Sequence, residues 1–291
     1  MFEDFWRAAN CAPSLRSRQG CGRGAECAAR RTSCASRDAA LHFWEEPPIS
    51  GEAAAEPCSS RIVLCIASIA KTPALPTVVQ ERTSPSRAWR GIFLELQGKG
   101  ALNINLVTAT HYAPMFSRRF GKRAQGFVCR CLEHLGYEAV ETVRLVAPYV
   151  QTFLTDFRYT DPETARAYSH APDYPHIARA ALDEMVRGDA DVIVRILALP
   201  GHIDEAKGAV RYLYETYGDR VVLSMMSQYT PAGSHPEHPE LDRRVSPEEF
   251  EELLDFADAI GCDEYFWQEG DAAQESFIPD FYSLEGVLGP E

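Results

Sequence analysis

The chain has 291 residues, 45% of them hydrophobic and 24% charged, which is typical of globular proteins and excludes a fibrous or disordered class. No apolar run reaches the roughly 18 residues of a membrane-spanning helix, and the first ten residues lack the basic start and apolar stretch of a secretion signal. The sequence therefore predicts a cytoplasmic protein with no membrane partner.

The net charge of −13 is unevenly distributed. Residues 1–40 hold seven arginines and four acidic residues, whereas residues 201–291 hold five basic and twenty-one acidic ones. Phosphate binding requires a large basic surface, so this distribution argues against a nucleic-acid partner. The acidic final third is interpreted as a solvated surface or as a surface that faces a partner protein.

In chain order, residues 1–40 form a Cys- and Arg-rich N-terminal segment. Residues 10–38 contain almost no large apolar side chains, so they are expected to be loop or disordered unless a metal organises them. The odd total of nine cysteines argues against a disulfide scaffold and leaves metal binding or buried thiols. The spacing of the N-terminal cysteines differs from the close C-x2-C pairs of structural zinc sites, although a zinc site or an iron–sulfur cluster at these cysteines remains an alternative. These residues are Cys11, Cys21, Cys27 and Cys34.

Residues 52–90 show neither the alternation of a half-buried strand nor the caps of a helix, so no element is predicted there. From residue 100 onward, short apolar runs alternate with amphipathic stretches, which predicts parallel strands joined by right-handed helical crossovers in a partial or complete βα barrel. Strands are predicted over residues 102–107, 151–157, 191–199, 220–227 and 263–268. Helices are predicted over residues 175–187, 203–217 and 246–260, the last with Ser246, Pro247 and Glu249 as a capping box.

Seven segments, in order, resemble one known family. They are LHFWEEPPISGE (41–52), GALNINLVTATHY (100–112), FLTDFRYTD (153–161), YSHAPDYP (168–175), VIVRILALPGH (192–202), LSMMSQYTP (223–231) and QEGDAAQESFIPDF (268–281). Together they resemble the radical S-adenosylmethionine (radical SAM) enzymes related to the pyruvate formate-lyase activating enzyme.

The resemblance implies an α/β fold, a partial (β/α) TIM-like barrel of the radical SAM type over residues 41–291. It also implies a [4Fe-4S] cluster and S-adenosylmethionine at the C-terminal strand ends. In this family, reductive cleavage of S-adenosylmethionine at the cluster gives a radical that abstracts hydrogen, typically from a glycine of a partner enzyme of the glycyl-radical type. Three thiolates hold the cluster and leave one iron open.

The chain departs from this family at the cluster motif, because C-x3-C-x2-C occurs nowhere in the sequence. We therefore assign no metal ligand and no catalytic residue, and expect that this chain does not bind the cluster. One alternative function is a non-catalytic remnant that binds a ligand or a partner without a cluster. Another is a metal-binding protein that uses the N-terminal cysteines.

A shifted reading frame accounts for the missing motif. When residues 55–77 (AEPCSSRIVLCIASIAKTPALPT) are back-translated and read one frame away with permitted codons, they give GAVFFSDCALHCVYCQNAGIAH, which contains C-x3-C-x2-C. The opposite shift turns residues 126–135 (GFVCRCLEHL) into GLSVVVWNTS, a strand-like run. We infer that residues 52–90 and about 115–135 are non-native in sequence, through either a sequencing error or gene decay.

Candidate ligand-binding residues lie near predicted strand ends. By resemblance, Asn105, Thr108, Thr110 and His111 face the methionine moiety of the cofactor; without the family, they form a polar strand end with a capped turn. His202 and the pair Gln228 and Tyr229 either line the substrate side or have turn and core roles.

Three charged residues complete the predicted site. Asp156 and Arg158 occupy the place of an Asp-x-Lys pair in the family and project on the same side of a strand; without the family they are an in-strand ion pair. Arg195 lies in an apolar strand, where an unpaired charge is costly, so it should contact an anion. By resemblance the anion is the cofactor carboxylate, and the alternative is an acidic residue such as Asp156.

Overall fold

In the computed structural model, the described residues are 136–231 and 236–268, the short strand segments before residue 135, and the single positions 94, 98 and 110. The chain divides into two compact units. The first comprises residues 1–134, 138–152 and 278–291, and the second comprises residues 135–137 and 153–277.

The first unit contains four neighbouring strands in the order β6-β5-β3-β2. β3 pairs with β5, and β5 with β6, in parallel, whereas β2 is antiparallel to β3. The four strands are β2 (Ala40–His42), β3 (Arg61–Cys65), β5 (Asn103–Val107) and β6 (Cys129–His134). The same unit includes the antiparallel pair β1 (Cys34–Ala35) and β4 (Thr83–Ser84), then α6 (Val140–Val146) and η5 (Ala147–Tyr149).

The expectation of no regular element over residues 52–90 is wrong at β3. A strand that is paired on both edges within a largely parallel sheet reads as a continuous apolar run, so the missing alternation in RIVLC did not exclude a strand. β1 and β4 likewise lie in stretches for which no element was predicted, although each spans only two residues. β6 forms within the segment whose sequence we infer to be non-native, and it buries Cys131 and Leu132.

The second unit is an α/β arrangement with strand order β10-β9-β8-β7. β8 pairs with β9, and β9 with β10, in parallel; Arg195 is in register with Ser224, and Ser224 with Phe266. The strands are β7 (Thr152–Asp156), β8 (Asp191–Leu197), β9 (Val222–Met226) and β10 (Tyr265–Gln268). The helices are α7 (Pro162–Ser169), α8 (Tyr174–Arg187), α9 (Ile203–Tyr217) and α10 (Pro247–Ala259), with the short turns η6 (Gly218–Arg220) and η7 (Pro239–Asp242).

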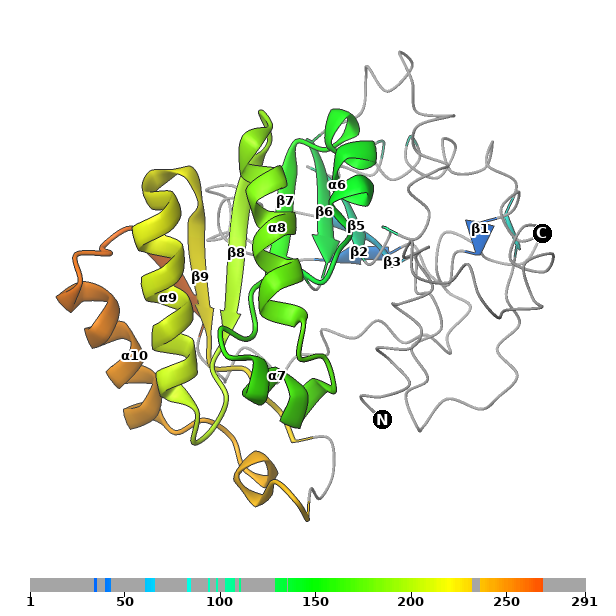
Figure 1. Cartoon of the computed structure of the whole chain (residues 1–291). Coiled ribbons are helices and arrows are strands. Elements are labelled where there is room, and N and C mark those ends of the chain that lie inside the picture. The colour runs from blue at the N-terminus through cyan, green and yellow to red at the C-terminus, as the bar shows by residue number, and fades with distance from the viewer. Residues whose placement is uncertain are drawn as a thin grey trace. The chain divides into compact units, whose positions relative to one another are not determined.

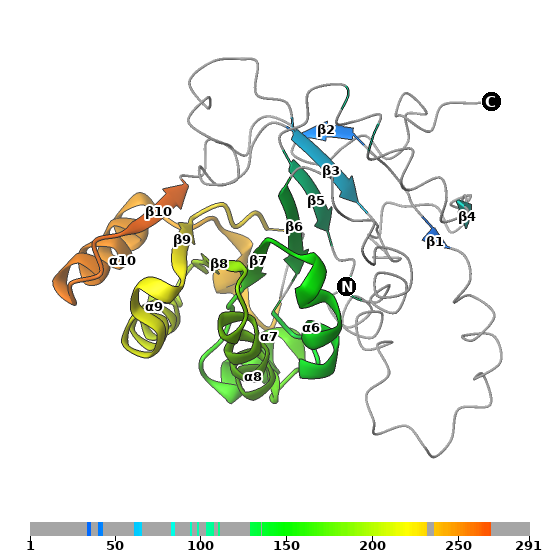
Figure 2. The same ribbon diagram turned by 90° about the horizontal axis from the view of Figure 1, so that it is seen from above.

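The helices of the second unit lie along one face of its strands (Figures 1 and 2). α8 and α9 pack on β8, and α10 packs on α9. Val192, Val194 and Ile196 of β8 are at most 2% exposed, and burying one such side chain contributes about 1.5–3 kcal/mol. This apolar layer holds the carboxyl ends of β7 and β8 in place.

The structure confirms the strands and helices predicted after residue 100, with bounds that differ by at most two residues at each end. α9 has the predicted bounds, and α10 carries the predicted capping box between Ser246 and Glu249. The fold class is α/β, with the parallel, unclosed strand arrangement of a partial (β/α) barrel. No helix among the described residues is both long and apolar enough to span a membrane.

Candidate functional site

The candidate site begins at the carboxyl end of β7. Asp156 is the last residue of this strand and is 8% exposed. Arg158 follows two residues later, and its Nε and Nη2 donate to Asp156 Oδ2 at 3.2 and 2.8 Å. The predicted acid and base are therefore in direct contact, but they are not an in-strand pair, because β7 ends at Asp156 and Arg158 lies beyond it.

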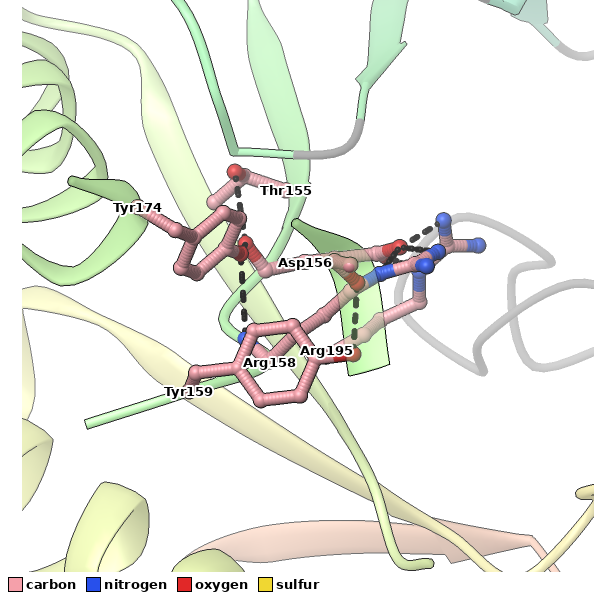
Figure 3. Close-up of polar contacts among 7 residues, drawn as sticks. Thr155, Asp156, Arg158, Tyr159, Tyr174 and Arg195 are labelled. Atoms are coloured by element: carbon pink, nitrogen blue, oxygen red, sulfur yellow. Dashed lines mark hydrogen bonds and ion pairs between the residues drawn. The ribbon is translucent and has the colours of Figure 1, made fainter. Parts of the chain in front are cut away.

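Arg195 reaches the same carboxylate from the neighbouring strand. Its Nε and Nη2 lie 2.9 and 2.8 Å from Asp156 Oδ1, so each carboxylate oxygen is bound by one guanidinium group (Figure 3). The amide of Phe157 donates to the carbonyl of Arg195 at 2.9 Å, which keeps the end of β7 beside β8. The alternative that Arg195 pairs with Asp156 is thus realised in the structure.

The two arginines set the ionisation of this carboxyl group. Burial would raise the pKa of Asp156, but the charges of Arg195 and Arg158 and their hydrogen bonds outweigh it and hold the pKa below its ordinary value. Burial would likewise lower the pKa of Arg158, and the charge of Asp156 raises it instead. Asp156, Arg158 and Arg195 are therefore all ionised at neutral pH, with two cations around one anion.

Two tyrosines and a glycine, which no sequence pattern indicated as site residues, support the group formed by Asp156, Arg158 and Arg195. Tyr174 is fully buried; its hydroxyl donates to the Asp156 carbonyl at 3.2 Å and accepts from the Arg158 amide at 3.0 Å. Tyr159 packs edge-on against Tyr174 at 5.4 Å between ring centroids (Figure 3). A Cβ at Gly136 would lie 2.1 Å from the Asp156 carbonyl oxygen, so only glycine fits there. The sequence signal that could have indicated this support is the position of Tyr174 within the family-like segment 168–175.

The other predicted ligand residues fall into the first unit or outside the described residues. Asn105 of β5 is 1% exposed, and its Nδ2 donates to Glu133 Oε2 at 3.3 Å. The hydroxyl of Thr110 donates to Glu138 Oε1 at 2.8 Å. Thr108 and His111 lie outside the described residues.

Glu138 has an unusual ionisation. Its burial raises the pKa of the carboxyl group to about 7, although the hydrogen bond from Thr110 acts in the opposite direction. A substantial fraction of this carboxyl group is therefore protonated at neutral pH, in the short segment GYE (136–138) that follows β6.

The residues that the structure describes include no set of ligands that fits a [4Fe-4S] cluster. Among the described residues, no group of three His, Cys, Asp or Glu side chains is arranged to hold a metal ion. The two cysteines with described side chains, Cys131 and Cys262, are buried in different units. Cys11, Cys21 and Cys27 lie outside the described residues, and Cys34 is described only as part of β1.

The residues predicted for the substrate side contact other residues of the second unit. Gln228 Nε2 donates to Gln268 Oε1 at 2.8 Å, which connects the end of β9 to the end of β10. The hydroxyl of Tyr229 donates to the carbonyl of Leu241 at 3.0 Å. His202 lies just before α9 and contacts Tyr168 and Glu240.

Comparison with known proteins gives limited matches. No known protein-family profile matches the chain. The uncharacterized protein MJ0674 of Methanocaldococcus jannaschii is 29% identical over 127 residues, which is 44% of this chain and 37% of that protein. Among solved structures, a radical SAM methyltransferase from Sphaerobacter thermophilus aligns with a TM-score of 0.43 and 11% identity, over 62% of this chain and 55% of that one.

Proposed function

We propose that this chain is a radical SAM-type protein, related to the pyruvate formate-lyase activating enzyme, that binds S-adenosylmethionine through the arginine pair Arg158 and Arg195. The seven family-like segments support the lineage. The observation that carries the binding assignment is the convergence of two guanidinium groups on Asp156 at the carboxyl ends of β7 and β8, the edge at which barrels of this class build their sites.

The arginine pair suits the carboxylate of an amino-acid moiety. Arg158 uses Nε and Nη2 on Asp156, and its Nη1 makes no hydrogen bond within the described part of the chain. Guanidinium groups bind carboxylates through charged, often paired hydrogen bonds. Asp156 holds Arg158 in place, so little side-chain entropy would be lost when an anion binds.

The cluster chemistry of the family is not part of this proposal. Hydrogen abstraction from a glycine of a partner enzyme requires three cluster thiolates, and the sequence has no C-x3-C-x2-C. We assign that activity, with its iron–sulfur cluster and its partner enzyme, to the protein that the intact reading frame would encode. The chain with its present amino-acid sequence keeps only the binding of S-adenosylmethionine or of a related carboxylate ligand.

Titration calorimetry with S-adenosylmethionine tests the binding assignment. We expect Arg158→Gln to weaken binding by on the order of tenfold to a hundredfold, the loss of a charged hydrogen bond. The same loss is expected when the unchanged protein is titrated with decarboxylated S-adenosylmethionine. The matched control is Arg166→Gln, because Arg166 makes only an exposed pair with Glu163 on α7.

Equal affinity for the two ligands, or an unchanged affinity in Arg158→Gln, would overturn the carboxylate assignment. Anaerobic treatment of the full chain with iron and sulfide tests the missing cluster separately. We expect a colourless protein, and a brown protein that cleaves S-adenosylmethionine under dithionite would show that the chain assembles a cluster after all.

A further inference from the structure

A second group of ionisable side chains lies in the second unit, apart from Asp156 and its arginines. It consists of Tyr168 at the end of α7, His202 just before α9, His238 just before η7 and Glu240 within η7. We refer to these four residues as the Tyr-His-Glu cluster. The side chains of His202, His238 and Glu240 are 31%, 31% and 30% exposed, so solvent and small molecules reach them.

Glu240 Oε1 is the centre of this cluster. The Tyr168 hydroxyl donates to it at 2.7 Å, and His238 Nδ1 lies 3.3 Å away. The Tyr168 hydroxyl oxygen is also hydrogen-bonded to His202 Nε2. The rings of His202 and His238 pack edge-on against the Tyr168 ring, with centroids 4.9 and 4.7 Å apart. His238 thus contacts Glu240 directly, whereas the Tyr168 hydroxyl lies between His202 and Glu240.

The directions of these hydrogen bonds follow from the donors available. A tyrosine hydroxyl has one proton, and here it is given to Glu240, so His202 Nε2 must carry the proton that it shares with the Tyr168 oxygen. Glu240 as a carboxylate can only accept, so His238 Nδ1 must also carry a proton. The hydrogen bond from Tyr168 lowers the pKa of Glu240, and burial raises that of Tyr168, which agrees with a charged carboxylate and a neutral phenol.

These directions leave the opposite ring nitrogens as proton acceptors when the imidazoles are neutral. For His238 this is Nε2, and for His202 it is Nδ1. His202 occupies the N-cap position of α9, yet its side chain makes no capping hydrogen bond, so Nδ1 is not used by the helix. A carboxylate that holds the Nδ1 proton of a histidine and leaves Nε2 basic is the arrangement by which hydrolytic enzymes orient a general base.

We propose that the Tyr-His-Glu cluster is a second functional site of this protein, in which Glu240 orients His238 as a general base toward hydroxyl-bearing molecules or water. The site lies on the segments that follow β7, β8 and β9, which is the edge where parallel α/β sheets place their ligands. Glu240 and Tyr168 act as positioning residues, and His238 Nε2 is the atom that receives the proton.

Imidazole ¹⁵N NMR of the full chain, at a pH where the histidine side chains are neutral, tests which ring nitrogens of His202 and His238 carry the proton. We expect His238 to carry its proton on Nδ1 and His202 on Nε2. In Glu240→Ala, His238 should revert toward a mixture of tautomers, whereas in Tyr168→Phe it should keep its proton on Nδ1. A general loss of stability would affect both variants alike, whereas His238 should respond to the loss of Glu240 and not to the loss of Tyr168.

Hydrolysis of p-nitrophenyl acetate tests the basic nitrogen. Water attacks the ester carbonyl and gives a proton to His238 Nε2, the bond to p-nitrophenolate breaks, and the proton then passes to solvent. We expect His238→Gln to lower the rate by on the order of tenfold, whereas His176→Gln, which changes an exposed histidine of α8, leaves it unchanged. Equal rates in the two variants, or a proton on Nε2 of His238 in the unchanged protein, would overturn the proposal.

Discussion

Asp156 shows how much of the site depends on one residue. Strand alternation suggested its pairing with Arg158, two residues away, although β7 ends at Asp156 and Arg158 lies just beyond the strand. Its pairing with Arg195, 39 residues away, depends on the position of β7 beside β8, which a single sequence does not specify. The sequence predicted that Arg195 contacts an anion, and the fold showed that Asp156 is one such partner.

Gly136 gives the sharpest test at the residue scale. It has φ of +76°, and an added Cβ would lie 2.1 Å from the Asp156 carbonyl oxygen and 3.1 Å from the Tyr174 hydroxyl. We expect Gly136→Ala to lower the free energy of unfolding by about 2–4 kcal/mol, measured by urea denaturation. Gly188→Ala is the control, since its Cβ would only touch the Met185 carbonyl at 3.4 Å; equal effects would contradict this account.

Glu138 predicts a pH dependence of stability. Its pKa rises to about 7 in the folded chain from an ordinary value of 4.5, so between these values the folded state holds a proton that the unfolded state has lost. This carboxyl group should therefore reduce the free energy of unfolding as pH increases from about 4.5 to 7.

We expect Glu138→Gln to remove that contribution, so that the variant gains stability relative to the unchanged protein at pH 8 but not at pH 4. Denaturant titrations at both pH values measure the difference. A gain of equal size at both would show that burial of the charge is not the cause. Glu141→Gln, on the exposed side of α6, is the control.

At the element scale, local sequence signals predicted α8, α9 and α10, whereas the shorter helices α6 and α7 were not predicted. α10 begins at its expected cap, with Ser246 Oγ accepting from the Glu249 amide at 3.2 Å and Glu249 Oε2 accepting from the Ser246 amide at 2.9 Å. β3 was missed, because a short apolar run without alternation fits a strand or a buried helix equally well and tertiary pairing decides between them. Strand pairing thus supplied what periodicity did not.

The cap of α10 can be tested directly. Ser246→Ala removes the acceptor for the Glu249 amide, and we expect it to lower the free energy of unfolding by about 1 kcal/mol. Thermal or urea denaturation measures this loss. Glu251→Ala, an exposed change on the same helix, should be close to neutral; a loss of equal size there would mean that helix propensity rather than capping is responsible.

At the scale of the whole molecule, we infer that a frame shift over residues 55–77 removed the cluster motif C-x3-C-x2-C. β3 ends at Cys65 within residues 55–77, so the chain as spelled has a strand inside the segment from which the shifted frame yields three cysteines. The structure therefore accommodates an apolar strand in that segment in spite of the altered letters. In the shifted frame the apolar run GAVFF corresponds to residues 55–60, whereas the residues of β3 correspond to the letters around the first cysteine, so the shift changes both the apolar run and the thiolate spacing.

Replacement of residues 55–77 by GAVFFSDCALHCVYCQNAGIAH tests this at the molecular scale. We expect the replaced chain to bind iron and sulfide and to become brown under anaerobic reconstitution, because it regains three thiolates in C-x3-C-x2-C. The same chain with those three cysteines changed to serine is the control and should stay colourless. A replaced chain that folds but binds no iron would contradict the inferred frame shift.

The sequence alone determined the α/β class, the bounds of most elements after residue 100 and the charged residues of the site. These depend on periodicity, on caps and on residue type, all of which are local. Only the tertiary structure decided that Arg195 and Arg158 share Asp156, that Tyr174 and Gly136 support them, and that Tyr168, His202, His238 and Glu240 meet. The physical reason is that strand order and loop position bring distant residues into contact, and one chain's pattern does not encode these pairings locally.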